Sequence, residues 1–213
     1  MVFSTPIFLY GFLPLMLAVY YLLPRPARNG WLVAGSYFFY GWGNPLYILL
    51  LLFSTLLDFV CALFIPSAGA RTRRLLLGAS LLGNLGVLAF FKYSGFLART
   101  AHDLAGLPGA DALAWLGTIA LPLGISFYTL QSLSYTMDVY RDEIHPTRRF
   151  VDFAAYVAFF PQLVAGPIVR YSQLAADLRN RRESRRQFAD GMGVFIIGLA
   201  KKREEIFRPG ESD

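Results

Sequence analysis

The chain has 213 residues, of which 55% are hydrophobic and only 16% are charged, with a formal net charge of +6 and a mean hydropathy of +0.46. Its apolar residues form long blocks separated by short arginine-bearing connections, whereas a soluble core interleaves apolar and polar residues. This argues against a soluble α/β domain and predicts an all-α, polytopic transmembrane helical protein. The basic residues lie in loops without an aromatic-interleaved stripe, so we expect no nucleic-acid partner.

Seven apolar segments are candidates for membrane helices, judged against the roughly 20 residues that a spanning helix needs. They cover 6–23, 31–41, 45–65, 75–91, 113–137, 151–169 and 188–200. The second and third are separated only by "GWGNP", a glycine- and proline-rich turn without charge. We therefore expect a helical hairpin at this point.

Arginines in the short loops set the orientation. Arg25 and Arg28 follow the first segment and Arg71 follows the third, so both loops should be cytoplasmic and the N-terminus external. A full crossing at 151–169 would then place six arginines within 170–186 outside. We favour a re-entrant segment, which enters and leaves on the cytoplasmic face. The alternative is a different topology for the proline-split segment 113–137.

The stretch "AYVAFFPQLVAGPIVRY" at 155–171 breaks the rules of a lipid-facing helix. Prolines remove backbone donors that hydrocarbon cannot replace, and irregular backbone at membrane depth is tolerated only against protein or a water-filled cavity. The sequence therefore predicts a lined site here. Its candidate residues are Pro161, Gln162, Gly166, Pro167 and Arg170.

A second polar group follows the break at Pro122 and Gly124. Helical spacing places Tyr128, Gln131 and Tyr135 on one face, which either lines a cavity or is an ordinary packing face.

Few other residues suggest chemistry. Asp58, inside an apolar segment, is expected to have a structural role, as an interhelical hydrogen-bond acceptor or the partner of a basic side chain, or, alternatively, to contact substrate. His102 and His145 both fall in predicted loops. The single cysteine, Cys61, excludes an intrachain disulfide and a cysteine-based metal cluster, and no metal site is expected.

Three stretches carry a family resemblance: "FFKYSGF", "LPLGISFYTLQSLSYTMDVYR" and "FFPQLVAGPIVRYSQL". In this order and spacing the chain resembles the membrane-bound O-acyltransferase family, in particular its bacterial alginate O-acetyltransferase branch. The resemblance covers residues 1–202 and implies the N-terminal part of such a domain. It implies a ring of helices around a thinned centre, where an acyl group from a cytoplasmic donor meets an acceptor on the other face.

The resemblance further implies acetyl transfer across the bacterial cytoplasmic (inner) membrane, with O-acetylation of an exported polysaccharide such as alginate. It implies a multi-pass protein in contact with membrane lipids and no bound cofactor, with an acyl donor such as acetyl-CoA as cosubstrate. The expected partners are extracytoplasmic acetyltransferase proteins and the polysaccharide assembly machinery. Gln162 and Arg170 would face the cavity.

The family's catalytic histidine belongs to a later transmembrane region, and neither His102 nor His145 matches it. The charged ending at 203–213 departs from the family pattern, so we expect a truncated family member. Two alternatives are a secondary transporter, which should show two related halves, and a non-catalytic membrane scaffold.

Overall fold

The computed structural model describes residues 5–105, 121–122, 124–164, 169–179, 181 and 183–207. Every regular element within these residues is helical, which confirms the predicted all-α class. The elements are η1 (Ile7–Phe12), α1 (Leu13–Leu22), α2 (Arg25–Gly41), α3 (Leu46–Phe64), η2 (Ile65–Ser67), α4 (Ala70–Ala105), α5 (Ile125–Tyr140), α6 (Phe150–Ala158), α7 (Phe160–Val164), α8 (Tyr171–Arg179) and α9 (Arg185–Phe207). Among the described residues, two stretches are long and apolar enough to cross a membrane, Leu46–Ser67 and Ala70–Phe96.

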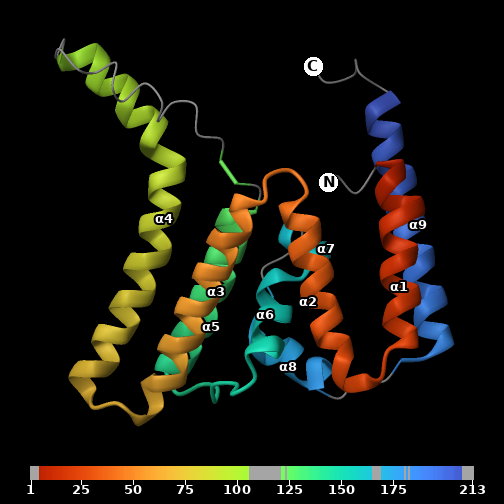
Figure 1. Cartoon of the computed structure of the whole chain (residues 1–213), viewed down its shortest axis with the longest axis horizontal. Helices are drawn as coiled ribbons and strands as arrows, with labels where there is room; N and C mark the ends of the chain where they lie inside the picture. Colours follow the sequence, from red (N-terminus) through yellow and green to blue (C-terminus); the bar gives the residue numbers. More distant parts are fainter. Residues whose placement is uncertain are drawn as a thin grey trace.

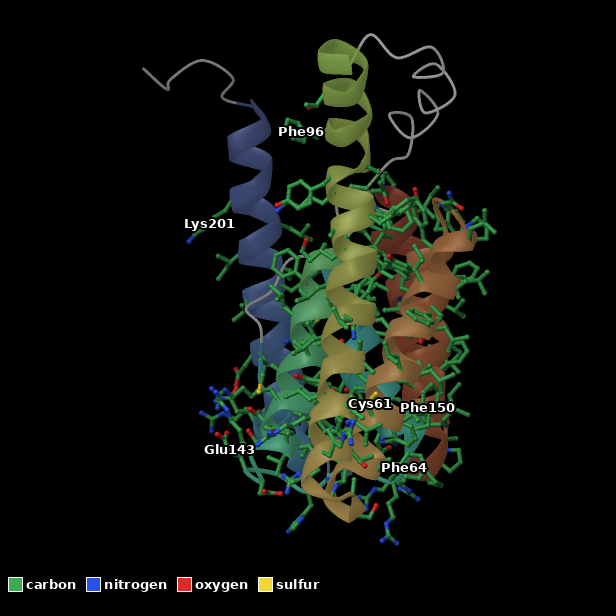
Figure 2. The ribbon with its side chains drawn as sticks, turned by 90° about the vertical axis from the view of Figure 1, so that its left-hand side faces the viewer. Cys61, Phe64, Phe96, Glu143, Phe150 and Lys201 are labelled. Carbon is green, nitrogen blue, oxygen red and sulfur yellow. The ribbon has the colours of Figure 1, made fainter. Side chains whose placement is uncertain are left out.

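The helices run up and down between two ends (Figure 1). One end holds the α1–α2, α3–α4 and α5–α6 connections together with α8, and we call it the arginine end. Arg73 ties its loops together, donating to the carbonyl oxygen of Tyr140 at 2.6 Å and pairing with Asp142 at 2.8 Å. Figure 2 shows nitrogen-tipped side chains gathered at this end, around the labelled Glu143 and Phe64, away from Phe96.

Some expected boundaries shift. The expected segment 31–41 begins earlier, because α2 starts at Arg25 and has Pro26 in its first turn, where proline is tolerated. The expected segment 75–91 is the middle of α4, whose last turn contains His102, so the prediction of a loop there is wrong. The charged tail expected from 203 begins inside α9, which continues to Phe207.

The core lies between α2, α3, α5 and α6 and is built from large buried side chains, with Tyr128, Tyr135, Phe153 and Tyr156 each no more than 1% exposed. The ring centroids of Tyr135 and Phe153 lie 4.5 Å apart, and those of Tyr156 and Tyr171 lie 5.2 Å apart. Aromatic contacts of this kind fix α5, α6 and α8 relative to one another.

The stretch 155–171 is irregular, as expected, and a break lies at Phe159, whose backbone is non-helical (φ −54°, ψ 108°), two residues before Pro161. Pro161 occupies the first turn of α7, where its missing N–H is tolerated. After α7 the chain returns to the arginine end, where α8 packs against α6 (Figure 1). Asn29 of α2 anchors this return by donating to Asp152 at 2.8 Å and to the carbonyl oxygen of Leu178 at 3.0 Å.

The second break, which was expected before α5, lies in contact with α7, directly after the break at Phe159. Gly124 precedes α5 in the left-handed conformation (φ 77°), which favours glycine. A Cβ atom at this position would lie 2.5 Å from the carbonyl oxygen of Leu163 in α7. The start of α5 therefore packs backbone to backbone against α7.

Replacing Gly124→Ala should lower stability by about 1–3 kcal/mol, because the new methyl group meets a backbone oxygen and the conformation is strained. The thermal unfolding midpoint in detergent measures this. The matched control is Gly86→Ala, where a Cβ meets nothing within 4 Å. Equal midpoints for the two variants would contradict the close approach.

Candidate functional site

The break at Phe159 leaves two backbone groups without their helical partners, and side chains from neighbouring helices replace them. In a continuous helix the N–H of Phe160 would bond to the carbonyl of Tyr156. Instead, the Phe160 N–H donates to Ser36 Oγ of α2 at 3.2 Å, and the Tyr156 carbonyl accepts from Gln131 Nε2 of α5 at 2.9 Å. The Tyr156 hydroxyl donates to the Val169 carbonyl at 2.9 Å, which ties the returning chain to α6.

An apolar cavity of about 400 Å³ lies on the α1 side of this break. Pro161 and Gln162, two of the predicted site residues, line it together with Tyr156. Apolar side chains of α1, α2, α6 and α8 form most of the remaining wall: Leu13, Met16, Leu17, Leu32, Ala155, Leu174 and Leu178. A second cavity, of about 830 Å³, lies between α1 and α9 and shares Pro161 with the first. Volumes of this size accommodate small organic ligands.

The other predicted site residues are not brought to these cavities. Tyr128 and Gln131 are buried, at 1% and 3% exposed, and line neither cavity; Tyr128 packs against Tyr40 with ring centroids 6.1 Å apart. Arg170 is 59% exposed at the arginine end and lies 3.6 Å from Glu143. Gly166 and Pro167 lie outside the described residues.

A charged cluster at the arginine end borders the first cavity and was not anticipated. Tyr20 and Arg181 line the cavity, and Arg181 Nη1 donates to the Tyr20 hydroxyl at 3.1 Å. Tyr20 in turn donates to Glu183, whose other oxygen lies 2.5 Å from Arg28 Nη1. Partial burial would raise the pKa of Glu183, but the hydrogen bonds from Tyr20 and Arg28 outweigh it and lower that pKa, so the carboxylate is ionised at neutral pH. A tyrosine at the end of an apolar segment is the one sequence signal for this cluster.

Asp58 forms the interhelical contact that one of the two sequence alternatives predicted. It is fully buried in α3 and accepts hydrogen bonds from Ser80 Oγ at 2.5 Å and Asn84 Nδ2 at 2.8 Å, both in α4. Ser54 of α3 donates to the Asn84 amide oxygen and extends the network. The polar positions of α4, spaced four residues apart within an apolar segment, were the available signal.

Acid–base and metal chemistry has few candidates here. His145 is exposed in the α5–α6 loop, and the backbone of His102 lies in α4 near the opposite end. Among the described residues no group of three or more histidine, cysteine, aspartate or glutamate side chains could hold a metal ion. The described geometry therefore offers a lined cavity and no assembled catalytic group.

Comparison with known proteins identifies homologues. No family model matches the chain, and no solved structure matches it. The chain is 40% identical over 206 residues to the probable alginate O-acetylase AlgI of Pseudomonas aeruginosa and 39% identical to that of Pseudomonas putida. It is 34% identical to the peptidoglycan O-acetyltransferase of Helicobacter pylori.

Each of these alignments covers 95% of this chain but only 39–44% of the relative, so the chain spans about two-fifths of the length of the proteins it matches. The names of these relatives agree with the resemblance carried by the three sequence stretches quoted above. The chain is therefore homologous, over 95% of its own length, to part of bacterial O-acetylases and of an O-acetyltransferase.

Proposed function

We propose that this chain acts in the O-acetylation of an exported polysaccharide, such as alginate, by moving acetyl groups across the cytoplasmic membrane. The observation that carries the proposal is the 39–40% identity to alginate O-acetylases over 95% of the chain. Peptidoglycan is the acceptor that the third relative's name points to. Both acceptors are glycan hydroxyl groups, so the proposed reaction type is the same.

The proposal places the chain in the bacterial inner membrane as a multi-pass protein, with the arginine end in the cytoplasm. Arg28, Arg73 and Arg170 lie at that end, and each is paired there with an acidic side chain. The α6–α7 segment leaves this end and returns to it, which supports the re-entrant arrangement expected from the arginine count. Its non-helical backbone is covered by α2 and α5, as membrane depth requires.

In this scheme the chain forms the walls of the cavities and positions the substrate. The second cavity meets the first at Pro161 and is largely apolar, so it would exclude water from an acyl thioester such as acetyl-CoA. A general base must still deprotonate the acceptor hydroxyl. His145 lines neither described cavity, and we assign that role to no described residue of this chain. Extracytoplasmic acetyltransferases and the polysaccharide assembly machinery are the proposed partners.

Membrane placement is tested by cysteine labelling in intact cells. With Cys61→Ala as background, Gly43→Cys in the α2–α3 turn should react with a membrane-impermeant reagent from outside. Gln173→Cys in α8 should react only after permeabilisation; both positions are exposed. Gln173→Cys labelling as strong as Gly43→Cys labelling in intact cells would overturn the re-entrant arrangement.

Acetylation is tested in a chimera, in which the aligned stretch of the Pseudomonas aeruginosa relative is replaced by the matching 95% of this chain. We expect the chimera to restore acetyl groups to alginate in a strain lacking that relative, because the alignment covers 206 residues. The control is the relative with the stretch deleted. A chimera that reaches normal membrane abundance yet adds no acetyl groups would count against the proposed function.

The two glutamines should behave differently in that chimera. Gln162→Ala should lower acetylation at unchanged membrane abundance, because the side chain lines the cavity. Gln131→Leu should lower membrane abundance and should lower the free energy of unfolding by about 1–3 kcal/mol. The reason is that it leaves the buried Tyr156 carbonyl without its Gln131 partner. Ser134→Ala on the same helix is the control, since the Ser134 hydroxyl donates to the Gln131 carbonyl of its own helix and not to the Tyr156 carbonyl. If both glutamine variants lose membrane abundance to the same extent, the role of Gln162 is structural and the prediction is wrong.

A further inference from the structure

The 400 Å³ cavity has two chemically different parts. Its body is apolar, formed by side chains of α1, α6 and α8 such as Leu17, Ala155 and Leu174. Its edge at the arginine end is formed by Tyr20 and Arg181. A molecule that satisfies both parts must combine an apolar chain with a polar group at one end.

The polar edge carries an excess of positive charge. Arg28 and Arg181 both lie over the ring of Tyr20, with guanidinium carbons 5.0 Å and 5.7 Å from its centroid. Among the described side chains of this cluster, Glu183 is the one carboxylate, and its short contact is to Arg28. Two guanidinium groups against one carboxylate leave a net positive charge, and Arg181 is the member of the pair that lines the cavity.

The surroundings add to this charge. Arg25, Arg185 and Arg186 are exposed and lie near Arg28 and Glu183 in sequence, at the arginine end. Basic pockets between helices on the cytoplasmic side are suited to anionic lipid headgroups. A soluble anion would contact the arginines alone and would not occupy the apolar body of the cavity.

We propose that this cavity binds one acyl chain of an anionic glycerophospholipid, with the lipid phosphate against Arg181 and the chain along α1 and α8. The proposal rests on the membrane placement above and not on acetyl transfer. Arg181 keeps its hydrogen bond to Tyr20 and presents its remaining N–H groups to the phosphate. The lipid would link the end of α1 to the segment that follows α8, which are joined here through Tyr20, Arg181 and Glu183.

The test uses the purified full chain and native mass spectrometry with phosphatidylglycerol and phosphatidylcholine of identical acyl chains. The wild type should retain phosphatidylglycerol preferentially. Arg181→Gln should reduce that preference roughly fivefold, the factor given by about 1 kcal/mol per basic residue beside an anionic lipid. Arg185→Gln removes an exposed charge that does not line the cavity, and it should leave the preference nearly unchanged.

Two further variants keep the result interpretable. Arg181→Lys preserves the charge and should retain the preference, which separates charge loss from misfolding. Ala155→Phe fills the apolar body and should reduce retention of both lipids. Equal retention of the two lipids by the wild type, equal effects of Arg181→Gln and Arg185→Gln, or displacement of the lipid by soluble glycerol phosphate would each overturn the proposal. If the chain does not lie in the membrane as proposed, the cysteine-labelling experiment described above shows this independently of lipid binding.

Discussion

The relative positions of α2, α5 and α6 depend on one backbone hydrogen bond that is missing at the end of α6. At Phe159 the helix that begins at Phe150 loses the bond between the Phe160 N–H and the Tyr156 carbonyl, and Pro161 removes the donor that the next turn would supply. Hydrocarbon cannot satisfy such groups, so protein must. Ser36 and Gln131 do so from opposite sides, and α2, α5 and α6 are thereby held in one relative position.

The same constraint separates the two sides of the α6–α7 segment. On the α5 side the packing is close, with Gly124 against the backbone of Leu163 and Tyr128 fully enclosed. On the α1 side the side chains leave space, and both described cavities are bordered by Pro161. Rigid support on one side and open volume on the other is the arrangement that a substrate-positioning wall needs.

Sequence patterns predicted the helices well where apolar blocks were bounded by glycine, proline or arginine, as at α1, α3 and the break before α5. They failed where a helix continued through polar residues, as in the first turns of α2 and the last turns of α4, because tertiary context decides such positions. Gln131 was recognisable as unusual, but its partner is a backbone carbonyl 25 residues away. Tyr20 and Arg181 are 161 residues apart, and no periodicity joins them.

In the proposed membrane placement, the charges of α4 have a consequence for the surrounding bilayer. The apolar run between Arg74 and Lys92 has 17 residues and rises about 26 Å. The hydrocarbon layer is about 30 Å thick. Asp58 fixes α4 to α3 through Ser80 and Asn84, so α4 cannot slide along α3 to reduce the mismatch. The long side chains of Arg74 and Lys92 must instead reach toward the two interfaces, or the lipid around the helix must thin, and the protein would impose a local variation in bilayer thickness on its own neighbourhood.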